Sequence, residues 1–137
     1  MIAVRVAESA IDRIAAVHRC ADVLEGMGAV QPSYRAAMVA RERSVSTYMG
    51  EGVATPHGID VSWALVRRDA LAVLRFPDGV DWAGHRVLVC VAIAARGDEH
   101  VELLAALAEI LLDPVRAAAL RAAEDPDQIV RMFCPWT

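Results

Sequence analysis

Helical spacing of apolar residues recurs over several stretches of the 137-residue chain. It runs from Ser9 to Gly26, through YRAAMVARER at 34–43, and through EHVELLAALAEILL at 99–112. Two more helices are expected to begin at Pro114 and Pro126, because proline is favoured in the first turn of a helix. The pattern therefore predicts five helices.

Strand-like patterns stand between these helices. IAVRV at 2–6 alternates weakly, whereas VLVCVAIAA at 87–95 is apolar on both faces, as a central strand is. ALAVLRF at 70–76, PDG at 77–79 and the following VDW together predict a hairpin that turns at PDG. The stretch 44–60, rich in Ser, Thr and Gly, indicates a loop with one brief strand. Helices that alternate with strands predict an α/β fold.

Composition and charge limit the functions to consider. With 56% hydrophobic and 23% charged residues, the chain is typical of a globular protein. The net charge is -4 and the Lys and Arg residues form no run, so nucleic acid is not an expected partner. No apolar run reaches the ~20 residues of a membrane-spanning helix, and the N-terminus lacks the pattern of a signal peptide. These features predict a cytoplasmic protein without membrane insertion.

Cysteine spacing and short motifs exclude further classes. Cys20, Cys90 and Cys134 are odd in number and far apart, which predicts neither a disulfide framework nor a thiolate metal site. The sequence contains no GxSxG, no GxGxxG, no HExxH and no glycine-rich phosphate loop of the nucleotide-binding type. Hydrolase, nucleotide-binding and zinc protease functions therefore lack their signatures.

The stretch GEGVATPHGID at 50–60 contains the first candidate for chemistry, His57. Pro56 fixes its own φ, and Gly58 lets the backbone turn past the imidazole, so the ring should be held and accessible. If one ring nitrogen donates to a carbonyl, the other stays unprotonated, and an imidazole of pKa about 6.5 can then attack phosphorus without a separate base. A histidine in such a turn can equally be structural, and the stretch alone leaves both possibilities open.

His100 is the second candidate, at the junction between the apolar run 87–95 and the following helix. Asp98 is the expected N-cap, and backbone N–H groups of the first helical turn favour an anion. His100 can also be merely a polar first-turn residue. A metal shared by His57 and His100 is a further alternative, although the sequence offers no third ligand at a suitable spacing.

Other polar residues near these histidines have structural alternatives of their own. Arg41 and Arg43 end a predicted helix, where cations stabilise the negative end of the dipole. Thr47 can make a local turn hydrogen bond, and Glu51 in its glycine-flanked turn can be solvated. Two further histidines receive only a structural interpretation: His18 and His85.

Taken in order, the motifs resemble a known family. YRAAMVARERSVSTYMGEGVATPHGID, followed downstream by IAARGDEHVELLAALAEIL, resembles the enzyme IIA domain of the mannitol/fructose class of the phosphoenolpyruvate-dependent sugar phosphotransferase system. The shared features are a tyrosine-led helix ending in RE, then STYxGEGxAxPHG, then a histidine that opens a helix. The resemblance covers about residue 9 to about residue 131.

The resemblance implies roles for five residues. His57 would be phosphorylated, and His100 would hold the phosphoryl oxygens or set the state of His57. Arg41 matches a basic residue near the phosphate, whereas Thr47 and Glu51 occupy motif positions of secondary importance. The phosphoryl group would come from the phosphohistidine of the small phosphocarrier protein HPr and pass to a cysteine of a IIB domain. No metal or other cofactor is implied.

The resemblance also implies an architecture and two possible functions. Residues 1–137 would form a single IIA-type domain, a mixed β-sheet with helices packed on it. The protein would then be a phosphocarrier in sugar uptake, or a regulatory, nitrogen-type relative whose phosphorylation state controls a binding partner. Met49, Val53 and Ile59, close to His57 in sequence, are the expected apolar docking patch.

Overall fold

The computed structural model describes residues 1–96 and 99–133, and the side chains of all of these except residues 60, 61, 99 and 100. Its strands are β1 (Ile2–Arg5), β2 (Tyr48–Gly50), β3 (Val53–Ala54), β4 (Ala70–Trp82) and β5 (His85–Ala94). They form one sheet in the order β1-β4-β5-β3-β2. The β1/β4 and β3/β5 pairs are parallel and the other two are antiparallel, which confirms the predicted mixed sheet.

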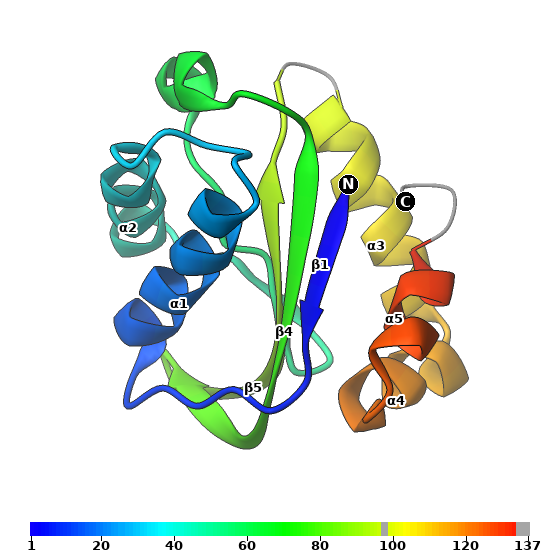
Figure 1. Ribbon diagram of the computed structural model, residues 1–137. Helices are drawn as coiled ribbons and strands as arrows, with labels where there is room; N and C mark the ends of the chain where they lie inside the picture. Colours follow the sequence, from blue (N-terminus) through cyan, green and yellow to red (C-terminus); the bar gives the residue numbers. More distant parts are fainter. Residues whose placement is uncertain (97–98, 134–137) are drawn as a thin grey trace.

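Helices cover both faces of this sheet (Figure 1). They are α1 (Arg13–Gly26), α2 (Tyr34–Ser44), α3 (Glu99–Leu112), α4 (Pro114–Ala122) and α5 (Pro126–Met132), with a 3₁₀ helix η1 (Asp60–Leu65). Helices α1 and α2 pack on one face, and α3, α4 and α5 on the other (Figure 1). The α/β class and the five predicted helices are thus confirmed. Within the described chain, no helix is long and apolar enough to cross a membrane.

Helix α1 begins later than its apolar periodicity suggested. The first helical residue is Arg13, not Ser9. The carboxylate of Asp12 accepts a hydrogen bond from the Ala15 backbone N–H at 2.8 Å, which satisfies one of the unpaired donors at the helix start. A capping side chain therefore sets this boundary. The N-cap predicted at Asp98 lies outside the described residues.

The sheet separates two apolar clusters, one under each helical layer. Along β4, Ala70, Ala72 and Leu74 join the cluster beneath α1 and α2. Leu71 and Val73 join the opposite cluster, because successive side chains of a strand point to opposite faces. Both faces of the central strands are therefore buried, and the predicted central strand is confirmed in β5, which lies between β4 and β3.

The predicted turn of the central hairpin is wrong in position. Strand β4 continues through PDG to Trp82, and the chain reverses at Ala83 and Gly84, whose φ angles are 53° and 93°. PDG instead forms an irregularity within the β4/β5 pair, with Gly79 at φ 78°. The Arg86 side chain of β5 packs against Gly79, where a Cβ would collide with the guanidinium nitrogen. A contact across the hairpin therefore turns this turn-like sequence into a bulge.

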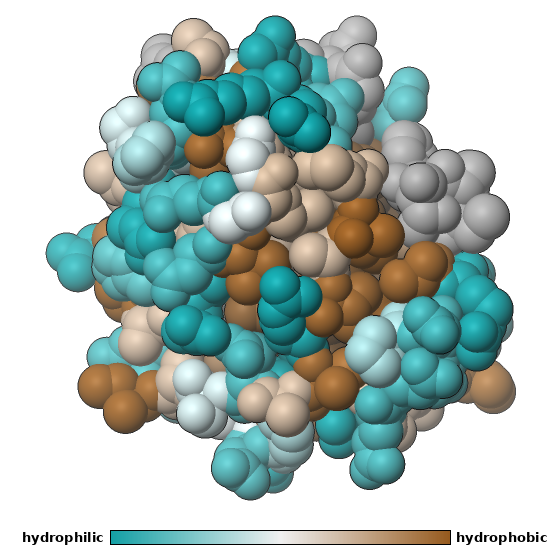
Figure 2. Space-filling view, viewed as in Figure 1, coloured by the Kyte–Doolittle hydropathy of each residue, from teal (hydrophilic) through white to brown (hydrophobic). Residues whose placement is uncertain are grey.

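In the described part of the chain, strand β1 forms one edge of the sheet and pairs with β4. Ile2, Val4 and Val6 are half-buried against the cluster beneath α3, α4 and α5. Hydrophobic residues gather near the centre of the molecular face seen in Figure 2, with hydrophilic residues to the left and at the lower right. The short N-terminal strand predicted from IAVRV is therefore confirmed as an apolar, packed edge of the sheet.

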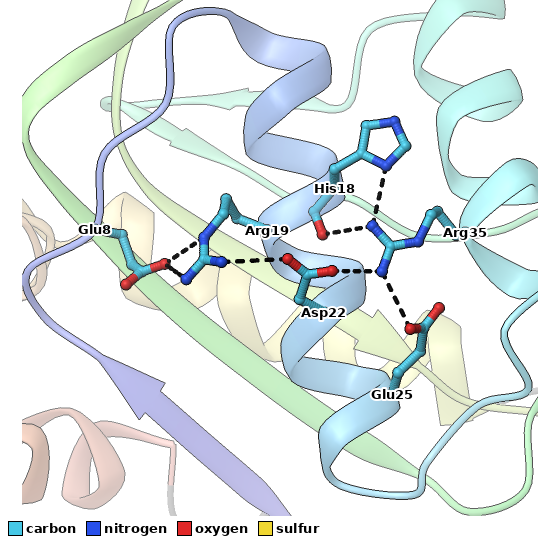
Figure 3. A network of polar contacts seen from close by, with 6 residues as sticks. All are labelled: Glu8, His18, Arg19, Asp22, Glu25 and Arg35. Atoms are coloured by element: carbon cyan, nitrogen blue, oxygen red, sulfur yellow. Dashed lines mark hydrogen bonds and ion pairs between the residues drawn. The ribbon is translucent and has the colours of Figure 1, made fainter.

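A polar network joins α1 to α2 and to the segment before α1 (Figure 3). Arg35 on α2 donates to the carboxylates of Asp22 at 2.5 Å and Glu25 at 3.1 Å. Its Nη1 also lies 3.0 Å from Nδ1 of His18, in agreement with the structural interpretation of this histidine. Arg19 continues the network to Glu8 at 2.7 Å. The pairs are partly solvent-exposed, so each contributes no more than about 1 kcal/mol.

We expect the thiols of Cys20 and Cys90 to be unreactive in the folded protein. Both are free and fully buried, and burial raises the pKa of the Cys90 thiol well above its ordinary value. In a Cys134→Ser variant, Ellman's reagent should label neither thiol until guanidinium chloride unfolds the chain, and then both. Rapid labelling without denaturant would contradict the packing of this cluster.

Candidate functional site

His57 lies in a segment that continues the sheet beyond β3. The Ile93 backbone N–H donates to the Pro56 carbonyl at 3.0 Å, and His57 itself pairs with Ile93 in parallel register. On the other side, the Thr55 backbone N–H donates to the Thr47 carbonyl at 3.0 Å. The segment is thus held from both sides. His57 is only 7% exposed, so it is less accessible than the sequence suggested.

A hydrogen bond to the backbone helps to orient the His57 ring. Nδ1 lies 2.6 Å from the backbone carbonyl oxygen of Thr55. A carbonyl oxygen can only accept, so Nδ1 carries the proton of this bond. In the neutral ring, Nε2 then holds the lone pair. This is the arrangement of a carbonyl and a protonated ring nitrogen that the sequence predicted for a nucleophilic histidine.

The structure requires a glycine at position 58 for a different reason from the one that the sequence suggested. A Cβ at this position would lie 2.6 Å from Cε1 of Tyr34 and would also collide with Oγ of Ser62. The Gly58 N–H donates to the Tyr34 hydroxyl at 2.8 Å, and that hydroxyl donates to the Ile93 carbonyl at 3.2 Å. Burial raises the pKa of Tyr34, which keeps the hydroxyl protonated. The glycine therefore makes room for Tyr34, not for the imidazole.

Replacing Tyr34 by phenylalanine should destabilise the protein by about 1 to 3 kcal/mol, because Gly58 N–H and Ile93 C=O each lose a buried partner. Urea unfolding measures the loss. Tyr48→Phe is the matched control, since the half-buried Tyr48 hydroxyl accepts a longer bond, of 3.3 Å, from the Gly52 N–H. Equal losses of stability in Tyr34→Phe and Tyr48→Phe would show that the two Tyr34 hydrogen bonds do not stabilise the fold.

A surface pocket brings three of the predicted site residues together. Arg41, Thr47 and His57 share its lining. The complete lining is Arg41, Ser46, Thr47, Tyr48, Met49, Thr55, His57 and Leu104. The chain therefore contributes to this pocket from α2, from the segment around β2 and β3, and from α3. A basic side chain, a hydroxyl group and an imidazole together suit an anionic ligand.

His100 stands in the first turn of α3, the helix that also contributes Leu104 to this pocket. The side chain of His100 lies outside the described residues, so its role stays a prediction. Among the residues whose placement is described, no group of three or more His, Cys, Asp and Glu side chains could hold a metal ion.

Arg41 contacts the chain just beyond its own helix and also lines the His57 pocket. The residue lies in the last turn of α2, and its guanidinium donates to the Val45 carbonyl at 2.5 Å. This contact with the chain just beyond the helix matches the structural interpretation of Arg41. The same side chain lines the His57 pocket, so a guanidinium with five N–H donors retains others for an anion.

Glu51 lies away from the His57 pocket. It occupies the tip of the turn between β2 and β3, where Gly50, Glu51 and Gly52 have φ angles of 101°, 54° and 75°. Arg121 on α4 donates to the Glu51 carbonyl at 2.9 Å and lies 3.5 Å from its carboxylate. Glu51 lines a separate pocket with Met49 and residues of α3. The structure therefore places Glu51 in a turn that Arg121 of α4 contacts.

Glu42, which the sequence motifs did not single out, is a buried acid in contact with Thr47 of this pocket. This carboxylate is 2% exposed and accepts hydrogen bonds from the Thr47 hydroxyl at 2.5 Å and from the Trp82 indole at 2.7 Å. A signal was present in the helix, because Tyr34, Met38 and Glu42 stand four residues apart and share the buried face. An acid on an apolar helical stripe is a sign of a buried polar contact.

The expected docking patch needs a correction. Ile59 is 41% exposed and Met49 is half-buried, but Val53 is fully buried in the cluster beneath α3, α4 and α5. Val53 faces inward because β3 pairs with β5 in the interior of the sheet. It therefore cannot contact a partner. The half-buried Leu104 of α3, in contrast, lines the His57 pocket.

Comparisons with known proteins agree on one family. The sequence model for "Phosphoenolpyruvate-dependent sugar phosphotransferase system, EIIA 2" matches residues 2–134. The chain is 41% identical over 128 residues to a multiphosphoryl transfer protein of Xanthomonas campestris, covering 93% of the chain and 15% of that protein. It is 36% identical over 118 residues to the mannitol-specific phosphotransferase enzyme IIA component of Staphylococcus aureus, covering 86% and 82%.

A solved structure has the same fold. The Escherichia coli complex of mannitol enzyme IIA with phosphorylated mannitol enzyme IIB contains a chain that matches with a TM-score of 0.88 at 24% identity, covering 96% of this chain and 97% of that one. At this identity the likeness concerns the fold alone. The chain spans only 15% to 25% of the length of the multiphosphoryl transfer proteins that it matches.

Proposed function

Because the chain belongs to the EIIA 2 family of the phosphoenolpyruvate-dependent sugar phosphotransferase system, we propose that it is a phosphocarrier that holds a phosphoryl group on Nε2 of His57. The contact of 2.6 Å between Nδ1 and the Thr55 carbonyl carries this proposal. It fixes the proton on Nδ1 and leaves the lone pair on Nε2, the atom that must attack phosphorus.

The chemistry needs positioning more than covalent machinery. Nε2 attacks the phosphorus of a phosphohistidine, the old P–N bond breaks, and the leaving imidazole keeps the electron pair. As Nε2 becomes bonded, the His57 ring gains positive charge, which the Nδ1–H bond to the Thr55 carbonyl stabilises. Arg41 lines the same pocket and is proposed to bind the phosphoryl oxygens. Thr47 is proposed to have a secondary role beside Arg41. His100 remains the proposed second histidine of the site.

The proposed partners are other proteins of the system. The donor would be the phosphohistidine of HPr, and the acceptor a cysteine of a IIB domain, whose sulfur attacks the phosphorus while the P–Nε2 bond breaks. The Escherichia coli complex, in which a IIA protein meets phosphorylated IIB, supports the second partner. The Staphylococcus aureus relative, named for mannitol, supports uptake of a mannitol/fructose-type sugar. A single IIA-type domain over residues 1–137 and a cytoplasmic location stay predictions.

Reconstitution tests this function. The full chain is incubated with phosphoenolpyruvate, enzyme I and HPr, and the product is examined for a phosphate that is labile to acid and stable to alkali. A mannitol-type or fructose-type IIB domain is then added, and the phosphate should move to its cysteine. If the phosphate forms but neither IIB domain accepts it, the sugar-uptake proposal is wrong and the regulatory, nitrogen-type alternative takes its place.

A further inference from the structure

Glu42 is a buried acid near the site with no role in the chemistry described above. Its carboxylate accepts from the Thr47 backbone N–H at 3.1 Å, from the Thr47 hydroxyl at 2.5 Å and from the Trp82 indole at 2.7 Å. The guanidinium of Arg13 lies 3.9 Å away. In all three hydrogen bonds an oxygen of the Glu42 side chain is the acceptor. Since a buried carboxylate is costly without partners, these donors hold Glu42 in one position.

A continuous series of hydrogen bonds leads from this carboxylate to the His57 ring. Glu42 holds both the amide and the hydroxyl of Thr47. The Thr47 carbonyl then accepts from the Thr55 backbone N–H at 3.0 Å and from its hydroxyl at 3.3 Å. The Thr55 carbonyl in turn accepts from His57 Nδ1 at 2.6 Å. Two threonines therefore stand between the buried acid and the imidazole.

The short segment between α2 and Thr47 is held by bonds between Arg41 and Val45, and the Ser46 hydroxyl accepts from the Tyr48 N–H at 3.2 Å. Ser44, Val45 and Ser46 are exposed, with Val45 at 61%. Thr47 itself is 5% exposed and is the first buried residue after Glu42. Glu42, in contrast, is tied to Trp82 on β4 in the core. The carboxylate thus connects the rigid core to the rim of the His57 pocket.

We propose that Glu42 is a positioning residue for His57, which acts through Thr47 and Thr55 to hold the Thr55 carbonyl where it keeps the proton on Nδ1. The inference rests on the proposed function only in that this tautomer supplies the nucleophilic Nε2. The geometry of the carbonyl and the tautomer of the ring can be measured without any phosphate transfer.

Glutamine at position 42 should break the series at its first step. Its amide has nearly the size of the carboxylate, but it presents one oxygen and one NH₂ group instead of two acceptor oxygens. The NH₂ group would meet either the Thr47 N–H or the Trp82 N–H, both of which are donors. Thr47 should therefore shift, and the Thr55 carbonyl with it.

The test compares Glu42→Gln with the native chain by long-range ¹H–¹⁵N NMR of the His57 ring. The native ring should be Nδ1-protonated. The variant should populate the Nε2-protonated tautomer, and its rate of phosphorylation by phospho-HPr should fall about tenfold to a hundredfold, as for a small misplacement of a reacting group. Glu42→Asp keeps the carboxylate, so it should recover part of the native tautomer population and part of the native phosphorylation rate.

Two controls separate positioning from loss of stability. Leu24→Ala removes a fully buried side chain of α1 and lowers stability without a place in the hydrogen-bond series. Glu25→Gln changes an acid that pairs with Arg35 instead. Both should keep the native tautomer and rate in the folded fraction. If Glu42→Gln behaves like Leu24→Ala in both measurements, Glu42 is structural only and the proposal is overturned.

If Glu42→Gln fails to fold, Thr47→Val decides the question. This variant removes only the hydroxyl that donates to Glu42 and should shift the tautomer in the same direction, by less. A native tautomer in Thr47→Val then overturns the proposal. If a folded His57→Ala variant is phosphorylated normally, the proposed function fails instead, and the tautomer of Glu42→Gln still tests the role of Glu42.

Discussion

His57→Ala should lose phosphate acceptance, with a fall of more than about 10³-fold in the rate of labelling by phospho-HPr, because the variant has no nucleophile at the reacting position. The methyl group of alanine can neither attack phosphorus nor donate to the Thr55 carbonyl. The backbone contacts of the segment with Ile93 and Thr47 do not use the imidazole, so the variant should fold. Labelling with radioactive phosphoenolpyruvate, followed by acid and alkali treatment, measures the loss.

A second histidine provides the matched control for this experiment. His18 on α1 contacts Arg35 through Nδ1 and lines a different pocket. His18→Gln keeps a side-chain acceptor for Arg35 and should be phosphorylated at the native rate. Acid-labile phosphate that forms on His57→Ala as fast as on His18→Gln would mean that the acceptor is another residue.

Gly58→Ala should destabilise the protein by about 3 kcal/mol, the upper part of the range for added volume in a packed site. The new Cβ would lie 2.6 Å from the Tyr34 ring and would collide with the Ser62 hydroxyl. The ring cannot move away cheaply, because its hydroxyl bonds both the Gly58 N–H and the Ile93 carbonyl. The same displacement should disturb His57 next to it. Urea unfolding followed by tryptophan fluorescence gives the free energy of unfolding.

Gly26→Ala is the control for this substitution. Gly26 is the last residue of α1, and nothing lies within 4 Å of a Cβ built there. Alanine should be neutral at Gly26 or stabilise the helix by up to about 1 kcal/mol, since it loses less conformational entropy than glycine. Adding Ser62→Ala to Gly58→Ala should recover only the part of the loss that comes from the hydroxyl. If Gly58→Ala is as stable as Gly26→Ala, Tyr34 does not pack against Gly58 as described.

The helices and the central strand could be predicted because their signals are local. Apolar periodicity and the prolines at 114 and 126 lie within the elements that they define. The hairpin could not be placed in this way, because PDG is compatible with a turn or a bulge. The Arg86 side chain from the opposite strand decides between them. Strand β3 has only two residues, too few for an alternation that would have shown Val53 to be buried.

The site likewise has a part that local sequence predicts and a part that depends on residues far along the chain. The orientation of His57 depends on Thr55, two residues away, so a protonated nitrogen facing a carbonyl could be predicted from PHG and its neighbours. Glu42 depends partly on Trp82, which is forty positions away and reaches it only through the fold. No local pattern links the RE of α2 to an indole on β4. The same holds for Tyr34, whose partners Gly58 and Ile93 come from a loop and a strand far along the chain.

The nitrogen that bears the phosphoryl group tests the central claim most directly. Protein labelled with ¹⁵N-histidine is phosphorylated by phospho-HPr, and ³¹P and long-range ¹H–¹⁵N NMR spectra identify the ring atom bonded to phosphorus. Because Nδ1 is 2.6 Å from the Thr55 carbonyl, the phosphorus should be bonded to Nε2 of His57 while Nδ1 keeps its proton. Phosphorus on Nδ1 of His57, or on any other histidine, would contradict the mechanism.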